Sequence, residues 1–237
     1  GLQRAVFEHT DDVCRRLVEQ GTPPDMVQVG NEVTNGMLWP DGRNDQGFER
    51  LAALLTAGCR AVRGRSAAAR VMLHVDNGGN NALYRWWFDA ILALGVDFDL
   101  IGASYYPFWH GTLADLQSNL DDLAERYGRD IVVVETSYAF TPEDFDGYAN
   151  ILHTEEVPGY RFTPEGQARF LADILTIVRA VPNGRGLGAM WWDATWTPVP
   201  GNGWDPADPA AGNNWENQAL FDFQGRPLAA LNWLGKP

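Results

Sequence analysis

The sequence has 237 residues, of which 45% are hydrophobic and 21% charged, values typical of a folded domain rather than a disordered chain. Lys and Arg total 18 and Asp and Glu total 31, so the formal net charge is −13, which argues against nucleic acid or an anionic membrane as a partner. No apolar run approaches the roughly 18 residues that a membrane-spanning helix needs. Cys14 and Cys59 lie in helix-like sequence and are expected to be buried thiols rather than metal ligands.

Apolar strand-like runs alternate with helix-like stretches along the chain. In order, the sequence predicts a helix over 6–19, a strand over 25–30, a helix over 48–62, a strand over 70–76, a helix over 83–94, a strand over 100–105, a helix over 112–127, a strand over 131–135, a helix over 163–180, a strand over 188–193 and a closing helix over 227–234. Two long loops are expected over 139–162 and 195–218. This alternation is typical of parallel βαβ units.

Polar or aromatic residues stand at the carboxyl end of every predicted strand, which is where α/β folds place their sites. A closed (β/α)8 barrel needs eight strands, and only five are predicted. The pattern therefore allows two folds: a TIM barrel lacking its first three strands, which we favour, or a complete five-stranded open sheet. Either one would be a single domain over residues 1–237. No Gly-x-Gly-x-x-Gly motif follows a strand, so nucleotide binding is not indicated.

Glu32 and Glu135 are the carboxylates expected to carry chemistry, because they end the first and fourth predicted strands. In a barrel, strands separated by two others face each other across the mouth. Two carboxyl groups about 5–5.5 Å apart are the arrangement of a retaining glycosidase, with one acid/base and one nucleophile. Structural roles are the alternative, Glu32 as a cap and Glu135 in a salt bridge. Their joint placement, with Asn31 before Glu32, favours catalysis.

Three segments carry a family resemblance: VQVGNEVTNGMLWP at 27–40, VETSY at 134–138 and NQALFDFQGRPL at 217–228. They resemble glycoside hydrolase family 53, the endo-β-1,4-galactanases. The resemblance implies a (β/α)8 barrel, double displacement, and β-1,4-galactan of pectic arabinogalactan as substrate. It makes Glu32 the acid/base and Glu135 the nucleophile. It also implies that the family's first three strands have no counterpart here, nor has an arginine that supports the nucleophile, so we expect a fragmentary sequence.

The resemblance also implies contacts with the substrate at the strand ends. Asn31 is expected to bind the sugar 2-hydroxyl, and either Tyr105 or Tyr106 is expected to hydrogen-bond the nucleophile. His74 and Asp76 are expected to face the substrate. For His74, a satisfied histidine inside the core is an equal alternative.

Several tryptophans lie beside Gly, Pro, Asn or Asp, as sugar-stacking platforms on loops do. Trp39 and Trp109 are expected to be platforms for outer sugar rings, with simple loop anchors as the alternative. Trp192 resembles the tryptophan beneath the catalytic sugar. Asp193 departs from the glutamate expected at that position, which would alter contacts with the sugar.

Oxygen ligands alternate in the loop after Glu135, which suits a hard cation such as calcium. The loop ligands would be Asp144, Asp146, a carbonyl near Tyr148, and Asn150. In bacterial members that this loop resembles, calcium ties the seventh loop to the eighth, where Asp205 and Asp208 are the expected partners. A solvated acidic loop is the alternative.

The expected partner is a polysaccharide, and the expected state is a monomer. No signal peptide is recognised at the start of the sequence, while the family implies a secreted protein. Two other functions stay open: another retaining glycosidase of the same clan, mannanase-like or cellulase-like, and a non-catalytic carbohydrate-binding protein.

Overall fold

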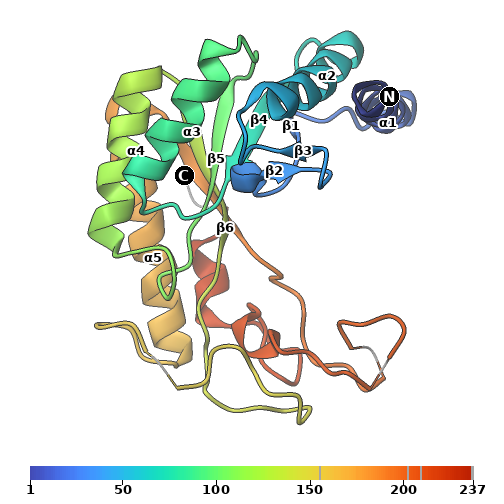
Figure 1. The fold of residues 1–237 in the computed structure, drawn as a ribbon. Coiled ribbons are helices and arrows are strands. Elements are labelled where there is room, and N and C mark those ends of the chain that lie inside the picture. The colour runs from blue at the N-terminus through green and yellow to red at the C-terminus, as the bar shows by residue number, and fades with distance from the viewer. Residues whose placement is uncertain (155, 202, 209, 236–237) are drawn as a thin grey trace.

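A curved sheet of five parallel strands organises the chain in the computed structural model, which describes residues 1–154, 156–201, 203–208 and 210–235 (Figure 1). The strands are β1 (Met26–Gln28), β4 (Arg70–Val75), β5 (Leu100–Ser104), β6 (Asp130–Thr136) and β7 (Gly186–Trp191). They lie in the order β1-β4-β5-β6-β7, and all four neighbouring pairs are parallel. The order in space is thus the order along the chain.

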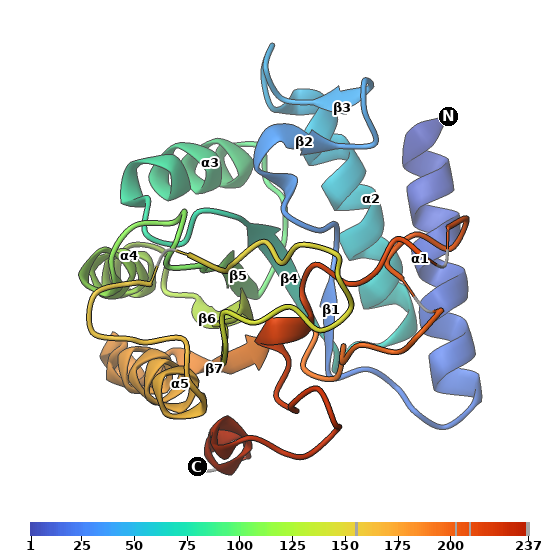
Figure 2. The same ribbon diagram turned by 90° about the horizontal axis from the view of Figure 1, so that it is seen from below.

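Five helices form an arc outside the sheet, as Figure 2 shows. They are α1 (Leu2–Glu19), α2 (Glu49–Arg65), α3 (Asn81–Ala93), α4 (Leu113–Tyr127) and α5 (Pro164–Ala180). Short elements complete the described chain: the hairpin β2 (Gly36–Met37) and β3 (Gly42–Arg43), and the 3₁₀ turns η1 (Val33–Asn35), η2 (Pro182–Gly184), η3 (Glu216–Gln218) and η4 (Ala229–Trp233). None of the described helices is long and apolar enough to cross a membrane.

The winding of the sheet decides between the two folds that the sequence allows. An open doubly wound sheet reverses its strand order at a switch point, whereas a barrel adds each strand on the same side. Here no reversal occurs, and the sheet face opposite the helices has its own apolar cluster, made by Met72, Leu100, Val132 and Val134. The five strands are therefore part of a (β/α)8 barrel.

Two elements differ from their prediction, the first strand of the sheet and the closing helix. The first strand is three residues long rather than six, because the backbone turns at Gly30, where φ is 82°. A side chain at residue 30 would also meet Val33 Cγ1 at 2.5 Å. The closing helix is the 3₁₀ turn η4, which packs against α5 and buries Ala230.

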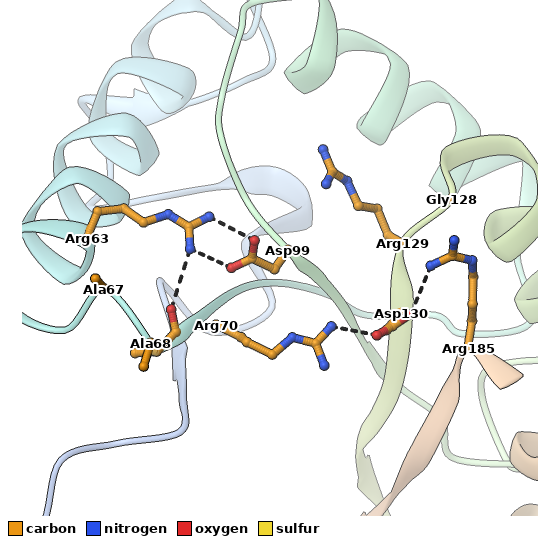
Figure 3. A pocket seen from close by; sticks show the side chains of 10 residues that line it. Arg63, Ala67, Ala68, Arg70, Asp99, Gly128, Arg129, Asp130 and Arg185 are labelled. Atoms are coloured by element: carbon orange, nitrogen blue, oxygen red, sulfur yellow. Dashed lines mark hydrogen bonds and ion pairs between the residues drawn. The ribbon is translucent and has the colours of Figure 1, made fainter.

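The amino ends of the strands are tied together by ion pairs, away from the site (Figure 3). Arg70 of β4 and Arg185, the residue before β7, both donate to the Asp130 carboxylate, at 2.7 and 2.9 Å. Arg63 of α2 makes two hydrogen bonds to Asp99. These contacts join four strands and one helix at the barrel floor.

A β-bulge in β6 determines which face of the sheet Glu135 occupies. Strict alternation would place Glu135 with Val133, whose side chain packs in the main core beneath the helices. The pairing changes from Ala103 opposite Val133 to Ser104 opposite Glu135, so β6 contains one extra residue. Glu135 therefore shares the barrel face with Ser104.

The closing signature fixes the long loops to the sheet. The Asn217 side chain donates to the carbonyls of Thr141 and Leu152, which belong to the loop after Glu135. Gln218 accepts a hydrogen bond from the hydroxyl of Ser137. The 217–228 segment thus holds the two loops side by side below the strands in Figure 1.

We expect two adjacent tryptophans of α3 to differ sharply in their effect on stability. Trp87 is 0% exposed and donates to the Val33 carbonyl, whereas Trp86 is 50% exposed. Trp87→Ala should lower the free energy of unfolding by about 3–5 kcal/mol, because it leaves a cavity and an unpaired carbonyl. Trp86→Ala, the matched control, should cost less than half as much in denaturant unfolding. Equal losses would contradict the packing described.

Candidate active site

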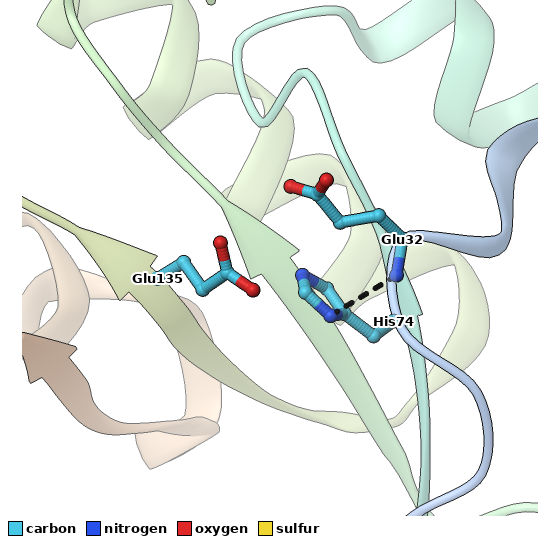
Figure 4. Close-up of side chains that lie close together, drawn as sticks. All are labelled: Glu32, His74 and Glu135. Atoms are coloured by element: carbon cyan, nitrogen blue, oxygen red, sulfur yellow. Dashed lines mark hydrogen bonds between the residues drawn. The ribbon is translucent and has the colours of Figure 1, made fainter. Parts of the chain in front are cut away.

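Glu32 and Glu135 meet on the barrel face of the sheet, at the carboxyl ends of β1 and β6 (Figure 4). A Glu32 oxygen, a Glu135 oxygen and a ring nitrogen of His74 all lie within 4.8 Å of one another. Glu32 adopts a left-handed conformation, φ 44° and ψ 52°, just before η1. Such a conformation is uncommon for a residue with a side chain, and it directs this carboxyl toward Glu135.

Each carboxyl group has a hydroxyl donor. Ser104 Oγ donates to Glu32 Oε1 at 2.6 Å, and the Tyr106 hydroxyl donates to Glu135 Oε2 at 3.1 Å. Both donors come from the end of β5, which lies between the strands that carry the carboxylates. Tyr106 is therefore the tyrosine that binds Glu135.

Burial governs the ionisation of Glu135. Burial, and after it the neighbouring Glu32, raise the pKa of this carboxyl to about 7, while the hydrogen bond from Tyr106 and the nearby Ser104 hydroxyl act in the opposite sense. Among the described residues, no lysine or arginine is a cause of this shift. Glu135 is thus fully ionised only above neutral pH in this chain.

His74 lies beneath the site rather than in contact with substrate. It is completely buried, accepts a hydrogen bond from the Glu32 backbone N–H at Nδ1 and contacts Ser104 Oγ through Nε2 at 2.7 Å. Burial lowers the pKa of its ring to about 4, so the imidazole is neutral. Its ring is enclosed and both its nitrogens have protein partners, which fits the alternative of a satisfied histidine inside the core.

Tyr105 lies on the helix side of the sheet, away from Glu32 and Glu135. Its ring is fully buried in the helix-side core, and its hydroxyl donates to the Gly111 carbonyl. Neighbouring strand residues point to opposite faces, so only Tyr106 of the pair reaches the site. Asp76 is half-buried and accepts a hydrogen bond from the Thr34 hydroxyl, which connects β4 to η1.

The expected sugar contacts are exposed. Asn31 is exposed and accepts from Gln28 Nε2, while Trp109 and Trp192 are exposed near the same edge of the sheet. Trp39 is 61% exposed, and the Arg43 guanidinium lies 4.8 Å from its ring centroid, so one ring face is already covered. Burial raises the pKa of Asp193, which has a positive φ of 51°.

A second carboxylate cluster lies where the two long loops meet. Asp144, Asp146 and Glu216 each place an oxygen within 4.8 Å of the others. Glu216 and Asn150 are both buried, and among the described residues Glu216 Oε2 and Asn150 Oδ1 have no hydrogen-bond partner. Burial and the two aspartates raise the pKa of Glu216 to about 7. These oxygen donors fit a hard cation.

Asp205 and Asp208 do not join this cluster in the described structure. Their backbones form an isolated antiparallel β-bridge. The Asp205 carboxylate accepts a hydrogen bond from the Ala207 N–H, and the Asp208 carboxylate accepts one from the Ala210 N–H. The eighth-loop carboxylate beside Asp144 and Asp146 is instead Glu216. The two aspartates expected as eighth-loop ligands thus each have an oxygen bound within a local turn.

Sequence reasoning missed two residues of these sites, Ser104 and Glu216. Ser104 stands two residues before Tyr106, and residues two apart share a face of a strand, so that spacing could have found it. Glu216 precedes the closing signature, and nothing local marks it. Only the folding of the two loops brings it to Asp146.

A singly wound parallel sheet with acidic residues at its strand ends defines the class of (β/α)8 barrels with their site at the carboxyl face. The chain matches the model of Glycosyl hydrolase family 53 over residues 1–234. It belongs to that family.

Similar proteins cover nearly all of this chain. It is 34% identical to an endo-beta-1,4-galactanase of Bacillus subtilis (strain 168), over 95% of this chain and 58% of that protein. It is 49% identical to an uncharacterized protein in the bgaB 5′ region of Niallia circulans, over 98% of this chain and 65% of that one. The family 53 catalytic domain of Ignisphaera aggregans superposes with a TM-score of 0.91 at 39% identity, covering 97% of this chain and 63% of that one. The chain thus spans about 60% of the length of these relatives.

The buried Glu135 predicts a specific pH dependence of stability. Its pKa is raised from 4.5 to about 7 on folding, so its favourable contribution is complete below pH 4.5 and is lost as the pH rises to 7. Glu135→Gln should therefore raise the free energy of unfolding by up to about 3 kcal/mol at pH 8, with little effect at pH 4. Denaturant unfolding at both pH values measures this. Glu125→Gln, at an exposed position on α4, is the control and should show no such difference.

Proposed function

We propose that this chain carries the catalytic pair of a retaining endo-β-1,4-galactanase. The observation that carries the proposal is the approach of Glu32 and Glu135 to within 4.8 Å at two strand ends. Carboxyl groups at about 5–5.5 Å serve retention, whereas inverting enzymes hold them about 6.5–9.5 Å apart to admit a water. Family membership and a relative named as a galactanase support galactan as the substrate.

The chemistry would proceed in two displacements. Protonated Glu32 gives its proton to the glycosidic oxygen while the Glu135 carboxylate attacks the anomeric carbon and forms a glycosyl ester. Glu32, now a carboxylate, removes a proton from water, which attacks the same carbon and releases Glu135. Tyr106 donates to Glu135 and orients it for attack.

Exposed aromatic rings would bind the polymer on either side of the pair. Trp109 and Trp192 offer apolar faces that match the C–H faces of sugar rings. Trp39 offers only one free face, since Arg43 covers the other. Asn31 would donate to a sugar hydroxyl beside Glu32.

We place the reaction outside the cell and in a single subunit. An endo-acting enzyme must meet a polymer that is too large to cross a membrane. Both carboxylates belong to one chain, so a monomer would suffice.

The two carboxylates should respond differently to removal. Glu135→Ala should abolish retaining turnover, and added azide, attacking from the vacated side, should restore cleavage with inverted stereochemistry. Glu32→Ala should slow galactan far more than activated aryl galactosides, because only poor leaving groups need the proton.

Reducing-end release and NMR of the products measure these effects. Tyr105→Phe is the control, because the Tyr105 hydroxyl binds the Gly111 carbonyl away from the site. This variant should keep both the stereochemistry of cleavage and the relative rates on galactan and aryl galactosides. Cleavage of mannan or cellulose but not galactan would favour another enzyme of the clan. Binding of galactan with no cleavage by the parent protein would favour a carbohydrate-binding protein.

We also propose a structural calcium ion between the two long loops, held by Asp144, Asp146, Asn150 and Glu216. The support is the cluster of three carboxylates together with the two buried oxygens that lack partners. When bound, the ion neutralises these charges and joins the loop after Glu135 to the loop before the closing signature.

Removal of calcium should destabilise the protein. A ligand that binds only the folded state adds roughly 2.7 kcal/mol at a hundred times its Kd, so a chelator should lower the Tm of calcium-loaded protein. Asp144→Ala with Asp146→Ala, or Glu216→Gln, should remove the response to chelator, and magnesium should substitute poorly. Asp205→Ala with Asp208→Ala should retain the response. Absence of calcium binding in calorimetry would contradict the proposal.

A further inference from the structure

Ser104 lies between the two carboxyl groups of the active site and is the residue that the proposed mechanism leaves without a role. It is completely buried at the end of β5, where its hydroxyl contacts Glu32 Oε1 at 2.6 Å and His74 Nε2 at 2.7 Å. It also lies opposite Glu135 in the strand register, because of the bulge in β6. Ser104 is also one of the groups that hold down the pKa of Glu135, although its hydrogen bond in this structure is to Glu32.

The direction of these hydrogen bonds follows from His74. The Glu32 backbone N–H can only donate, so His74 Nδ1 must accept and carry no proton. The ring is neutral, so its single N–H is at Nε2 and points to Ser104 Oγ. Ser104 therefore accepts from His74, and its own hydrogen is free to be donated.

The Ser104 hydroxyl donates to Glu32 in this structure and lies opposite Glu135 on the same face of the sheet. Of two neighbouring carboxyl groups, the more negative one attracts the hydrogen more strongly, because hydrogen bonds to a charged acceptor are roughly twice as strong as neutral ones. In a double displacement the negative charge changes position. Before the first displacement Glu135 is ionised and Glu32 protonated; after it, Glu135 is a neutral ester and Glu32 is ionised.

We propose that the Ser104 hydroxyl is a shared donor that turns toward Glu135 before glycosylation and toward Glu32 in the glycosyl-enzyme. This inference rests on the proposed function. Ser104 and His74 are then positioning residues. Rotation about the Ser104 C–O bond moves the hydrogen, no bond to hydrogen is broken, and His74 holds the oxygen in place throughout.

Other groups around the pair do not duplicate this role. Those that act electrostatically on Glu135, His74 or their neighbours are Asp76, Tyr84, Tyr106, His110 and Asp193. Tyr106 binds Glu135, and no hydrogen bond from it to Glu32 is present in the described structure. Within that part of the chain, Ser104 alone has a hydroxyl that binds one carboxylate, Glu32, and lies opposite the other, Glu135.

The test is a titration that needs no turnover. Carboxyl ¹³C NMR follows Glu135 alone in a Glu32→Gln background and Glu32 alone in a Glu135→Gln background. Adding Ser104→Ala should raise the titration midpoint by roughly one pH unit in both backgrounds, because the ionised form loses a charge-assisted hydrogen bond. Ser104→Thr, which keeps a hydroxyl, should restore both midpoints.

Ser137→Ala is the matched control. Ser137 is an equally buried serine beside the site, its hydroxyl is bound to Gln218, and its removal should leave both midpoints unchanged. A shift in only one background would show a fixed donor and overturn the inference, as would no shift in either. If the parent protein cleaves no galactan while both shifts occur, the proposed function fails and the shared donor stands.

Discussion

The central constraint in this molecule is the approach of two carboxyl groups to within 4.8 Å in a largely buried site. Two full negative charges at that distance repel by about 3–4 kcal/mol at an effective dielectric of 20. A proton held by the pair removes this cost, and burial raises the pKa of Glu135 in the same direction. The pair is therefore poised to have one acid and one base, which is the condition that double displacement requires.

Which of Glu32 and Glu135 ionises first also depends on the hydrogen-bond donors and cations beside each carboxyl group. In this chain Glu135 has little such support. A nucleophile should be the more easily ionised member, yet in the described chain the Glu135 carboxyl accepts a hydrogen bond only from the Tyr106 hydroxyl, has the Ser104 hydroxyl as a neighbour, and has no cation beside it. Hydroxyl donors stabilise a carboxylate less than an arginine does. The resemblance implies an arginine from the family's second strand at this place, and a cation there would lower the pKa of Glu135 and set the order of ionisation.

Much of the fold could be predicted from the sequence, because helix and strand periods depend on local alternation of apolar residues. The five strands, their parallel pairing and the positions of Glu32 and Glu135 at strand ends all follow from that pattern. The face occupied by Glu135 could not be predicted, since the bulge after Val133 overrides alternation. Burial of His74 and Tyr105 likewise depends on packing from elements distant in sequence, which the pattern does not report.

The carboxylates Asp144, Asp146 and Glu216 repel one another as the catalytic pair does, but two of the three are exposed to solvent. Asp144 and Asp146 are exposed and receive donors from their own turns, so water and backbone already stabilise them. Glu216 is buried, with one oxygen bound to the Phe145 N–H and the other without a partner. A proton would neutralise Glu216 alone, whereas the proposed cation would satisfy that orphaned oxygen and both aspartates together. In the catalytic pair the compensating charge must move during the reaction, which favours protons and a rotating hydroxyl. In the loops it must stay, which favours a metal ion.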